Sequence, residues 1–230
     1  MNLSGKVIAV TGSDGALGSA VAAALGKYGA RLVLLQHSTG DAGAAPAGAL
    51  RYGAVDLTRE DAARSAMDRA AREAGRLDGL INVAGGFLWE KVAGGTLDSW
   101  ETMYKLNLRT AVVSCQAALP HLVKSGSGRI VNVGAMGAIK AAAGMGAYAA
   151  SKAGVAQLTE ALADELKDRH ITVNAILPSI LDTPKNRLDM PQADFGRWVA
   201  PADAAEVIAF LVSDEARAVT GALIPVAGRL

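Results

Sequence analysis

The chain has 230 residues, of which 51% are hydrophobic and 20% are charged, a composition that fits one globular domain with a full core. Because 23 basic residues nearly balance 22 acidic ones and no apolar run is long enough to span a bilayer, we expect a cytoplasmic protein without nucleic-acid or membrane partners. The single cysteine excludes an internal disulfide, and the three histidines lack metal-ligand spacing, so we expect no metal site.

Short apolar segments, typical of buried strands, alternate with longer amphipathic segments from end to end. Strands are expected at 6–11, 31–35 and 50–56, and within LDGLINVAGG, RIVNVGA, HITVNAILP and ALIPVAG. Helices are expected at 16–28, 59–74, 98–124, 147–168 and 201–212. Asp56 or Thr58 is a candidate cap for the second helix, and the polar segment HSTGDAGAAPAGA (37–49) is expected to be a flexible loop.

Apolar strands separated by helices predict a parallel sheet that is covered on both faces. Neither an internal repeat nor a proline-rich linker divides the chain. We therefore expect one α/β domain over residues 1–230, a doubly wound Rossmann domain with a mainly parallel seven-stranded sheet.

The first expected strand runs into TGSDGALG, residues 11–18. Glycines at a strand-to-helix turn let backbone N–H groups approach a phosphate at the helix N-terminus. A glycine-rich turn that binds nothing is the alternative, but the position after the first strand favours a dinucleotide. The candidate cofactor-binding residues of this turn are Gly12, Ser13, Asp14, Ala16, Leu17 and Gly18.

The fourth expected strand ends in a turn of small residues, INVAGG, at 81–86. Ligands of open α/β sheets lie beyond the carboxyl ends of the strands, so Ala84, Gly85 and Gly86 are expected to face the cofactor. This signal is weak by itself, because many strands end in such turns.

Tyr148 and Lys152 lie at positions i and i+4 of an expected helix, and therefore on one face of it. The pKa of a free tyrosine is about 10, and a nearby ammonium group favours the phenolate and lowers that pKa. The pair can then serve as an acid or base near neutral pH. An isolated pair of this kind is more often an ordinary surface tyrosine and lysine.

Taken together, TGSDGALG, NVAG, Asn107 in KLNLRT and YAASK resemble the motifs of the short-chain dehydrogenase/reductase family along essentially the whole chain. The resemblance implies a nicotinamide cofactor, with Tyr148 as the proton donor or acceptor. It implies that Lys152 holds the ribose and that Asn107 supports a water-linked proton relay. Family members usually pair through the two long helices, so a homodimer or homotetramer is implied as well.

The family's catalytic serine stands thirteen positions before the tyrosine, where this chain has Ala135. A missing hydrogen-bond donor weighs against ordinary ketone or alcohol chemistry. Ala16, VAGGF and above all LDTPKNRLDMPQADFGRW (181–198) resemble the dihydropteridine reductase branch, which also has alanine at this position. That branch reduces quinonoid dihydropterins, so we expect NAD(P)H-dependent reduction of a small planar acceptor. A conventional carbonyl reductase or alcohol dehydrogenase, and a non-catalytic dinucleotide-binding protein, are the alternatives.

The residue after the second strand, Gln36, is neither the acid that selects NAD nor the arginine that accepts a 2′-phosphate. Asp14 would repel a 2′-phosphate, whereas His37 or Ser38 would favour one, so we lean to NADH and keep NADPH open. By resemblance, Asp56 with Leu57 contacts the adenine. Likewise by resemblance, the remaining cofactor-binding residues are Pro178, Ile180 and Thr183.

Four of the ten aromatic residues fall in the two segments expected to border the nicotinamide: Phe87, Trp89, Phe195 and Trp198. Flat rings stack on a flat heterocycle, which makes these four residues and Ala135 candidate substrate contacts, with 177–200 as the substrate loop. Aromatic residues that pack only on one another are the equally weighted alternative.

Overall fold

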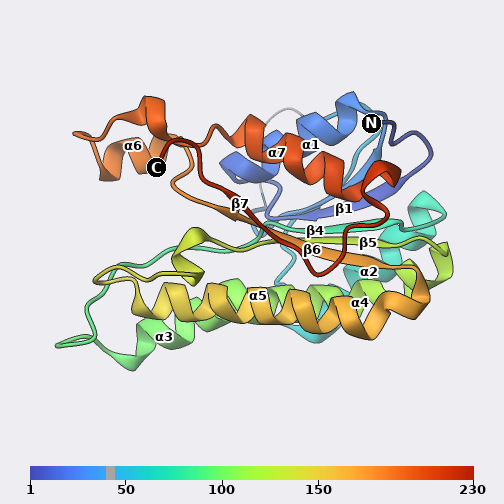
Figure 1. Cartoon of the computed structure of the whole chain (residues 1–230). Helices are drawn as coiled ribbons and strands as arrows, with labels where there is room; N and C mark the ends of the chain where they lie inside the picture. Colours follow the sequence, from blue (N-terminus) through green and yellow to red (C-terminus); the bar gives the residue numbers. More distant parts are fainter. Residues whose placement is uncertain (40–44) are drawn as a thin grey trace.

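The computed structural model describes residues 1–39 and 45–230, so the middle of the expected loop at 37–49 lies outside the described residues. Seven parallel strands form one twisted sheet in the order β3-β2-β1-β4-β5-β6-β7 (Figure 1). The strands are β1 (Val7–Thr11), β2 (Arg31–Leu35), β3 (Leu50–Tyr52), β4 (Gly79–Asn82), β5 (Arg129–Val133), β6 (Thr172–Pro178) and β7 (Leu223–Val226). The expected doubly wound fold is confirmed, and every strand pair is parallel.

Helices cover both faces of the sheet. Their bounds are α1 (Ala16–Lys27), α2 (Glu60–Ala74), α3 (Leu97–Met103), α4 (Thr110–Ser125), α5 (Gly146–Leu166), α6 (Pro184–Asp189) and α7 (Pro201–Val212). α1 and α7 lie on one face, and α2, α4 and α5 lie on the other (Figure 1). No described helix is both long and apolar enough to cross a bilayer.

Alternation along each strand divides the apolar side chains between two cores. Ala9, Leu80 and Ile130 point into the core beneath α2, α4 and α5, whereas Val10 and Ile81 point into the core beneath α1 and α7. Successive side chains of a strand face opposite sides, so strands buried on both faces are apolar at nearly every position. This is why the sequence shows continuous apolar runs.

Three local expectations are wrong. The expected helix 98–124 is interrupted by a π-helical turn, η1 (Tyr104–Arg109), which separates α3 from α4. Neither Asp56 nor Thr58 caps α2: the N-cap is Arg59, and the Asp56 carboxylate instead accepts hydrogen bonds from the backbone N and Oγ1 of Thr58. The strand expected at 50–56 ends at Tyr52, because the backbone turns at Ala54, which has a φ of 55°.

The strand order reverses direction at β1, which lies between β2 and β4. Thr11 ends β1 in register with Asn82 of β4, and the Thr11 Oγ1 accepts hydrogen bonds from the backbone N of Val83 (3.1 Å) and Ala84 (3.2 Å). The glycine turn after β1 is therefore tied to the small-residue turn after β4. Ligands of open α/β sheets bind at such a reversal point.

Candidate functional site

The glycine turn between β1 and α1 has a shape that side chains would fill. Gly12 has a φ of 62°, and a Cβ there would lie 2.8 Å from the Cα of Ala84. A Cβ at Gly18 would collide with the Gly12 carbonyl, which brings α1 close to the turn. α1 begins at Ala16 without a side-chain cap, so the first N–H groups of the helix face this turn. The turn fits a dinucleotide pyrophosphate.

Around the turn, Ser13 is buried and its Oγ donates to the Leu35 carbonyl at 3.3 Å, and Leu17 packs into the core. Asp14 faces the segment that follows β2, where its Oδ2 accepts a hydrogen bond from Ser38 Oγ at 2.8 Å. Gln36 is only 3% exposed, and its backbone bonds Tyr52 and Val55. Asp14 is therefore the more exposed polar group of the two.

Asp56 follows β3 and lies at the same edge of the sheet, beside the buried Leu57. Hydrogen bonds from Thr58 hold the pKa of the Asp56 carboxyl below its usual value. The carboxylate is thus ionised at neutral pH and available as a hydrogen-bond acceptor.

The Asn107 side chain is hydrogen-bonded to the backbone of the turn after β4. Its Oδ1 accepts from the Gly86 N at 2.8 Å, and its Nδ2 donates to the Gly86 O at 3.1 Å and to Ser151 Oγ at 2.9 Å. A Cβ at Gly85 would lie 2.5 Å from Asn107 Oδ1 and 3.4 Å from Lys152 Nζ. The structure therefore brings Asn107, Lys152 and the small-residue turn together, and only glycine fits between them.

Tyr148 and Lys152 lie in the first two turns of α5, as expected. Lys152 is buried, and its Nζ donates to the Val133 carbonyl at 2.7 Å. Burial lowers the pKa of Lys152 to about 8 and raises the pKa of Tyr148 to about 12. The pKa of Tyr148 thus shifts opposite to the direction expected from the sequence, because loss of hydration disfavours the phenolate.

Ala135 lies two residues beyond the end of β5 and is buried, at 5% exposed. It begins a short 3₁₀ turn, η2 (Met136–Ala138). Gly137 of this turn lies beside the Tyr148 ring, where a Cβ would be 3.7 Å from Cε1 and 3.0 Å from the Met145 Cε. The Gly137 position is therefore bordered by carbon atoms of Met145 and Tyr148.

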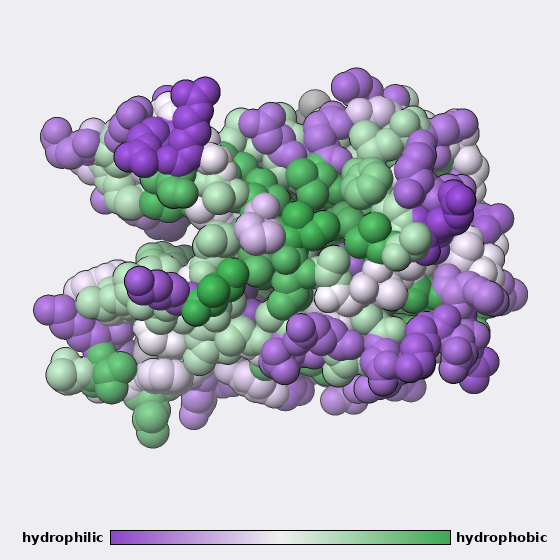
Figure 2. Space-filling view, in the orientation of Figure 1, coloured by the Kyte–Doolittle hydropathy of each residue, from purple (hydrophilic) through white to green (hydrophobic). Residues whose placement is uncertain are grey.

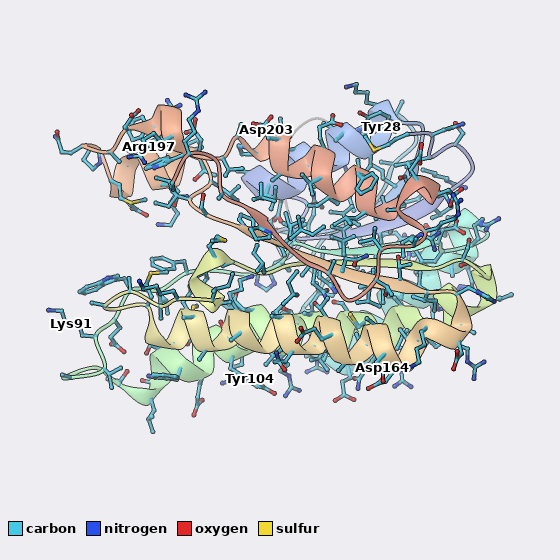
Figure 3. All side chains as sticks on the ribbon, in the orientation of Figure 1. Tyr28, Lys91, Tyr104, Asp164, Arg197 and Asp203 are labelled. Atoms are coloured by element: carbon cyan, nitrogen blue, oxygen red, sulfur yellow. The ribbon has the colours of Figure 1, made fainter. Side chains whose placement is uncertain are left out.

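The aromatic candidates divide into two pairs on opposite sides of an opening. Phe87 meets the Tyr148 ring edge to face with a centroid distance of 5.0 Å, and Trp89 packs over Gly144. On the other side, Phe195 packs against Trp198 at 4.7 Å. Figure 2 shows a hollow between the two parts of the molecule that carry these aromatic pairs. Figure 3 places Lys91 and Arg197 on opposite rims of this hollow.

Exposure separates the four rings further. Phe87 and Trp89 are 47% and 58% exposed, whereas Trp198 is 8% exposed. Phe195 lies under the Arg187 guanidinium, which also pairs with Asp182 through two hydrogen bonds of 2.6 and 2.7 Å. Phe87 and Trp89 therefore present more ring surface to a ligand than Trp198 does.

Residues after β6 continue the same edge of the sheet. Pro178 ends β6, and Ile180 is partly buried. Thr183 caps α6, its Oγ1 accepting a hydrogen bond from the backbone N of Asn186 at 3.2 Å. The three predicted residues thus lie in the segment that leads from the end of β6 into α6.

Ser151 is the buried polar residue that the sequence analysis missed. It accepts the hydrogen bond from Asn107 and donates to the Tyr148 carbonyl at 2.7 Å. The sequence YAASK shows a serine between the tyrosine and the lysine. Its hydrogen-bond partner, Asn107, lies in a helical segment far from it in the sequence. Among residues 1–39 and 45–230, no cluster of His, Cys, Asp or Glu is placed to hold a metal ion.

Known proteins share both the sequence pattern and the fold. The family model described as short chain dehydrogenase matches residues 6–193. The 3-oxoacyl-[acyl-carrier-protein] reductase FabG of Thermotoga maritima is 30% identical, over 100% of this chain and 99% of the relative. Cis-4-hydroxycyclohexanecarboxylate dehydrogenase of Sinomonas cyclohexanicum is 35% identical, over 97% of this chain and 95% of the relative.

Solved structures agree over the whole length. NAD⁺-bound xylitol dehydrogenase superimposes with a TM-score of 0.91 at 27% identity, covering 99% of this chain and 100% of that one. Carveol dehydrogenase from Mycobacterium avium in complex with NAD gives 0.87 at 27% identity, covering 99% and 98%.

Proposed function

Because this chain belongs to the short-chain dehydrogenase family of NAD(P)-dependent oxidoreductases, we propose that it reduces a small, planar, activated acceptor such as a quinonoid dihydropterin. The observation that carries the proposal is Ala135, a buried methyl group where the resemblance places a catalytic hydroxyl. On this proposal, Tyr148 is the group that donates the proton to the acceptor.

Tyr148 is suited to donate a proton. With a pKa of about 12, its phenol stays protonated across the neutral range. When bound, a reduced nicotinamide dinucleotide supplies the hydride to the acceptor carbon. Tyr148 gives its O–H proton to the neighbouring nitrogen or oxygen, which leaves the acceptor reduced by one hydride and one proton. We assign return of the proton from solvent to a water chain beside Asn107, and the hold on the ribose to Lys152.

The acceptor class follows from what Ala135 lacks. A ketone gains from a second donor that polarises its oxygen, and loss of one such donor costs about a hundredfold or more in rate. A conjugated quinonoid imine accepts hydride more readily than a ketone, so one donor can suffice. The exposed rings of Phe87 and Trp89 support a flat acceptor.

A second candidate, reduction of a simple ketone or oxidation of an alcohol, is favoured by the names of the relatives. Cis-4-hydroxycyclohexanecarboxylate dehydrogenase and cyclopentanol dehydrogenase are both named for cyclic alcohols. On this reading, a donor other than residue 135 would polarise the carbonyl oxygen.

One assay separates the two candidates. Oxidation of NADH and NADPH is followed with quinonoid dihydrobiopterin and with a panel of ketones and quinones. Brisk turnover of a simple ketone without turnover of the pterin would refute the activated-acceptor proposal. Ala135→Ser should raise ketone reduction while leaving the native acceptor unchanged. Tyr148→Phe should remove most activity in either case.

Three further proposals accompany the function. NADH is the preferred cofactor because Asp14 places a carboxylate beside the segment after β2. Residues 1–230 act as one domain, since a single sheet runs through the described chain. The functional form is a homodimer or homotetramer that pairs through the helices of 97–125 and α5.

A further inference from the structure

Two buried Asn–hydroxyl pairs join α5 to neighbouring elements. Asn107 Nδ2 donates to Ser151 Oγ at 2.9 Å, and Ser151 donates to the Tyr148 carbonyl at 2.7 Å. Farther along the helix, Asn132 Nδ2 donates to Thr159 Oγ1 at 2.9 Å, and Thr159 donates to the Val155 carbonyl at 2.8 Å. The two pairs have the same chemistry and are both buried. They differ in the element that carries the asparagine, which is strand β5 for Asn132 and the π-helical turn η1 for Asn107.

The Asn132 pair is redundant as a positioning device. Asn132 lies in β5, whose backbone is in register with β4 on one side and β6 on the other. The two ladders fix its position whether or not Thr159 accepts the hydrogen bond. Thr159 also lies eleven residues beyond Tyr148, about 16 Å along the helix axis.

Asn107, in contrast, is not fixed by strands on either side. Asn107 lies in the π-helical turn η1, where the regular i to i−4 ladder is interrupted. Its side chain is placed by its hydrogen bonds to Gly86 and Ser151. Gly85 lies between that side chain and Lys152, with no room for a Cβ.

We propose that Ser151 is a positioning residue which, acting through Asn107, sets the spacing between Lys152 and the Gly85–Gly86 turn and thereby the affinity for the nicotinamide dinucleotide. The proposal rests on the proposed function only in taking that spacing as part of the dinucleotide site. Ser151 itself is buried, at 5% exposed, and acts without touching the ligand. Without Ser151, the Asn107 amide keeps its two bonds to Gly86 and a longer bond from Nδ2 to Met103 Sδ at 3.7 Å, so its remaining short hydrogen bonds all go to the turn that it should hold in place.

The test compares Ser151→Ala with the matched control Thr159→Val. Each variant removes one buried hydroxyl that accepts from an Asn Nδ2, so we expect similar drops in Tm. Only Ser151→Ala should weaken binding of NADH and NADPH, by about fivefold, the fold-change that corresponds to one neutral hydrogen bond. Binding is measured by fluorescence titration without any acceptor, and Tm without cofactor.

Two results overturn the proposal: a Kd for Ser151→Ala within twofold of the wild type, or an equal weakening by Thr159→Val. Should Ser151→Ala fail to fold, Ser151→Cys, with its weaker acceptor, is judged by the same criteria. Binding of NADH without turnover of any acceptor refutes the activated acceptor alone and leaves this comparison intact. A wild-type chain that binds neither dinucleotide overturns both proposals.

Discussion

Burial of the Lys152 side chain opposes the stability of the fold at neutral pH. Burial lowers its pKa from 10.5 to about 8, so below pH 8 the folded chain carries a desolvated ammonium group. This lowering of the Lys152 pKa corresponds to a loss of about 3 kcal/mol in the free energy of unfolding at neutral pH, because each pKa unit is worth about 1.36 kcal/mol. The unfolded chain binds more protons between pH 8 and 10.5, so this group makes stability rise with pH through that window and adds no penalty above it.

We therefore expect the free energy of unfolding of Lys152→Met at pH 7 to exceed that of the wild type by about 2 kcal/mol. The gain is smaller than the full penalty because the Val133 carbonyl loses its hydrogen-bond donor, a cost of about 1 kcal/mol. Urea unfolding of the cofactor-free protein at pH 7 and pH 10 measures this. The exposed Lys140→Met should change neither value, and a less stable Lys152→Met at pH 7 would contradict the account.

Asp14 is the residue whose charge we propose to bear on the choice between NADH and NADPH. Its carboxylate is held toward the segment after β2 by Ser38. Repulsion of a 2′-phosphate at short range is worth roughly 1 to 4 kcal/mol, so Asp14→Asn should improve kcat/KM for NADPH by about tenfold or more and change that for NADH little. Asp98→Asn, which alters the net charge equally at the start of α3, is the control. Equal effects on both cofactors would contradict the assignment.

At the scale of elements, the helical layer departs most from expectation. The apolar periodicity of residues 98–124 predicts one continuous helix, because a π-helical turn adds a residue without changing the residue types. That turn places Asn107 in the site. The Tyr148–Lys152 pair, in contrast, follows from i, i+4 geometry alone and was predictable. Ser151 was not, since its partner comes from another helix.

The loop that carries Trp89 packs against Gly144 through the indole ring. This glycine has a φ of 77°, and a Cβ there would overlap the indole ring. Gly144→Ala should therefore lower stability and raise KM for the acceptor several-fold, as the loop of Trp89 is displaced. Gly94→Ala is the matched control, with a φ of 82° and nothing within 4 Å of the added Cβ.

Backbone strain should thus be common to both variants, about 1 kcal/mol or more. The effect on KM should be confined to Gly144→Ala. Thermal unfolding and steady-state kinetics of the pair decide the matter. An unchanged KM in Gly144→Ala would show that the loop of Trp89 does not contact the acceptor.

At the scale of the whole molecule, apolar side chains remain exposed on the outer side of the helical layer. Tyr104 of η1 is 49% exposed, and Figure 3 shows it on the side away from the sheet. If the proposed oligomer pairs through these helices, Tyr104→Glu should shift it to a smaller species in light scattering. Leu188→Glu, on α6 and 81% exposed, should leave the mass unchanged. A monomeric wild type would refute the pairing.

The sequence by itself determined the class of the fold and the identity of the Tyr148–Lys152 pair. Both depend on local periodicity: strands buried on two faces are apolar throughout, and residues four apart share one helix face. Only the tertiary structure decided that Ser151 supports Asn107, that Gly85 lies between Asn107 and Lys152, and that burial raises the pKa of Tyr148. These features depend on packing between elements far apart in the chain, and hydration is lost only when those elements meet.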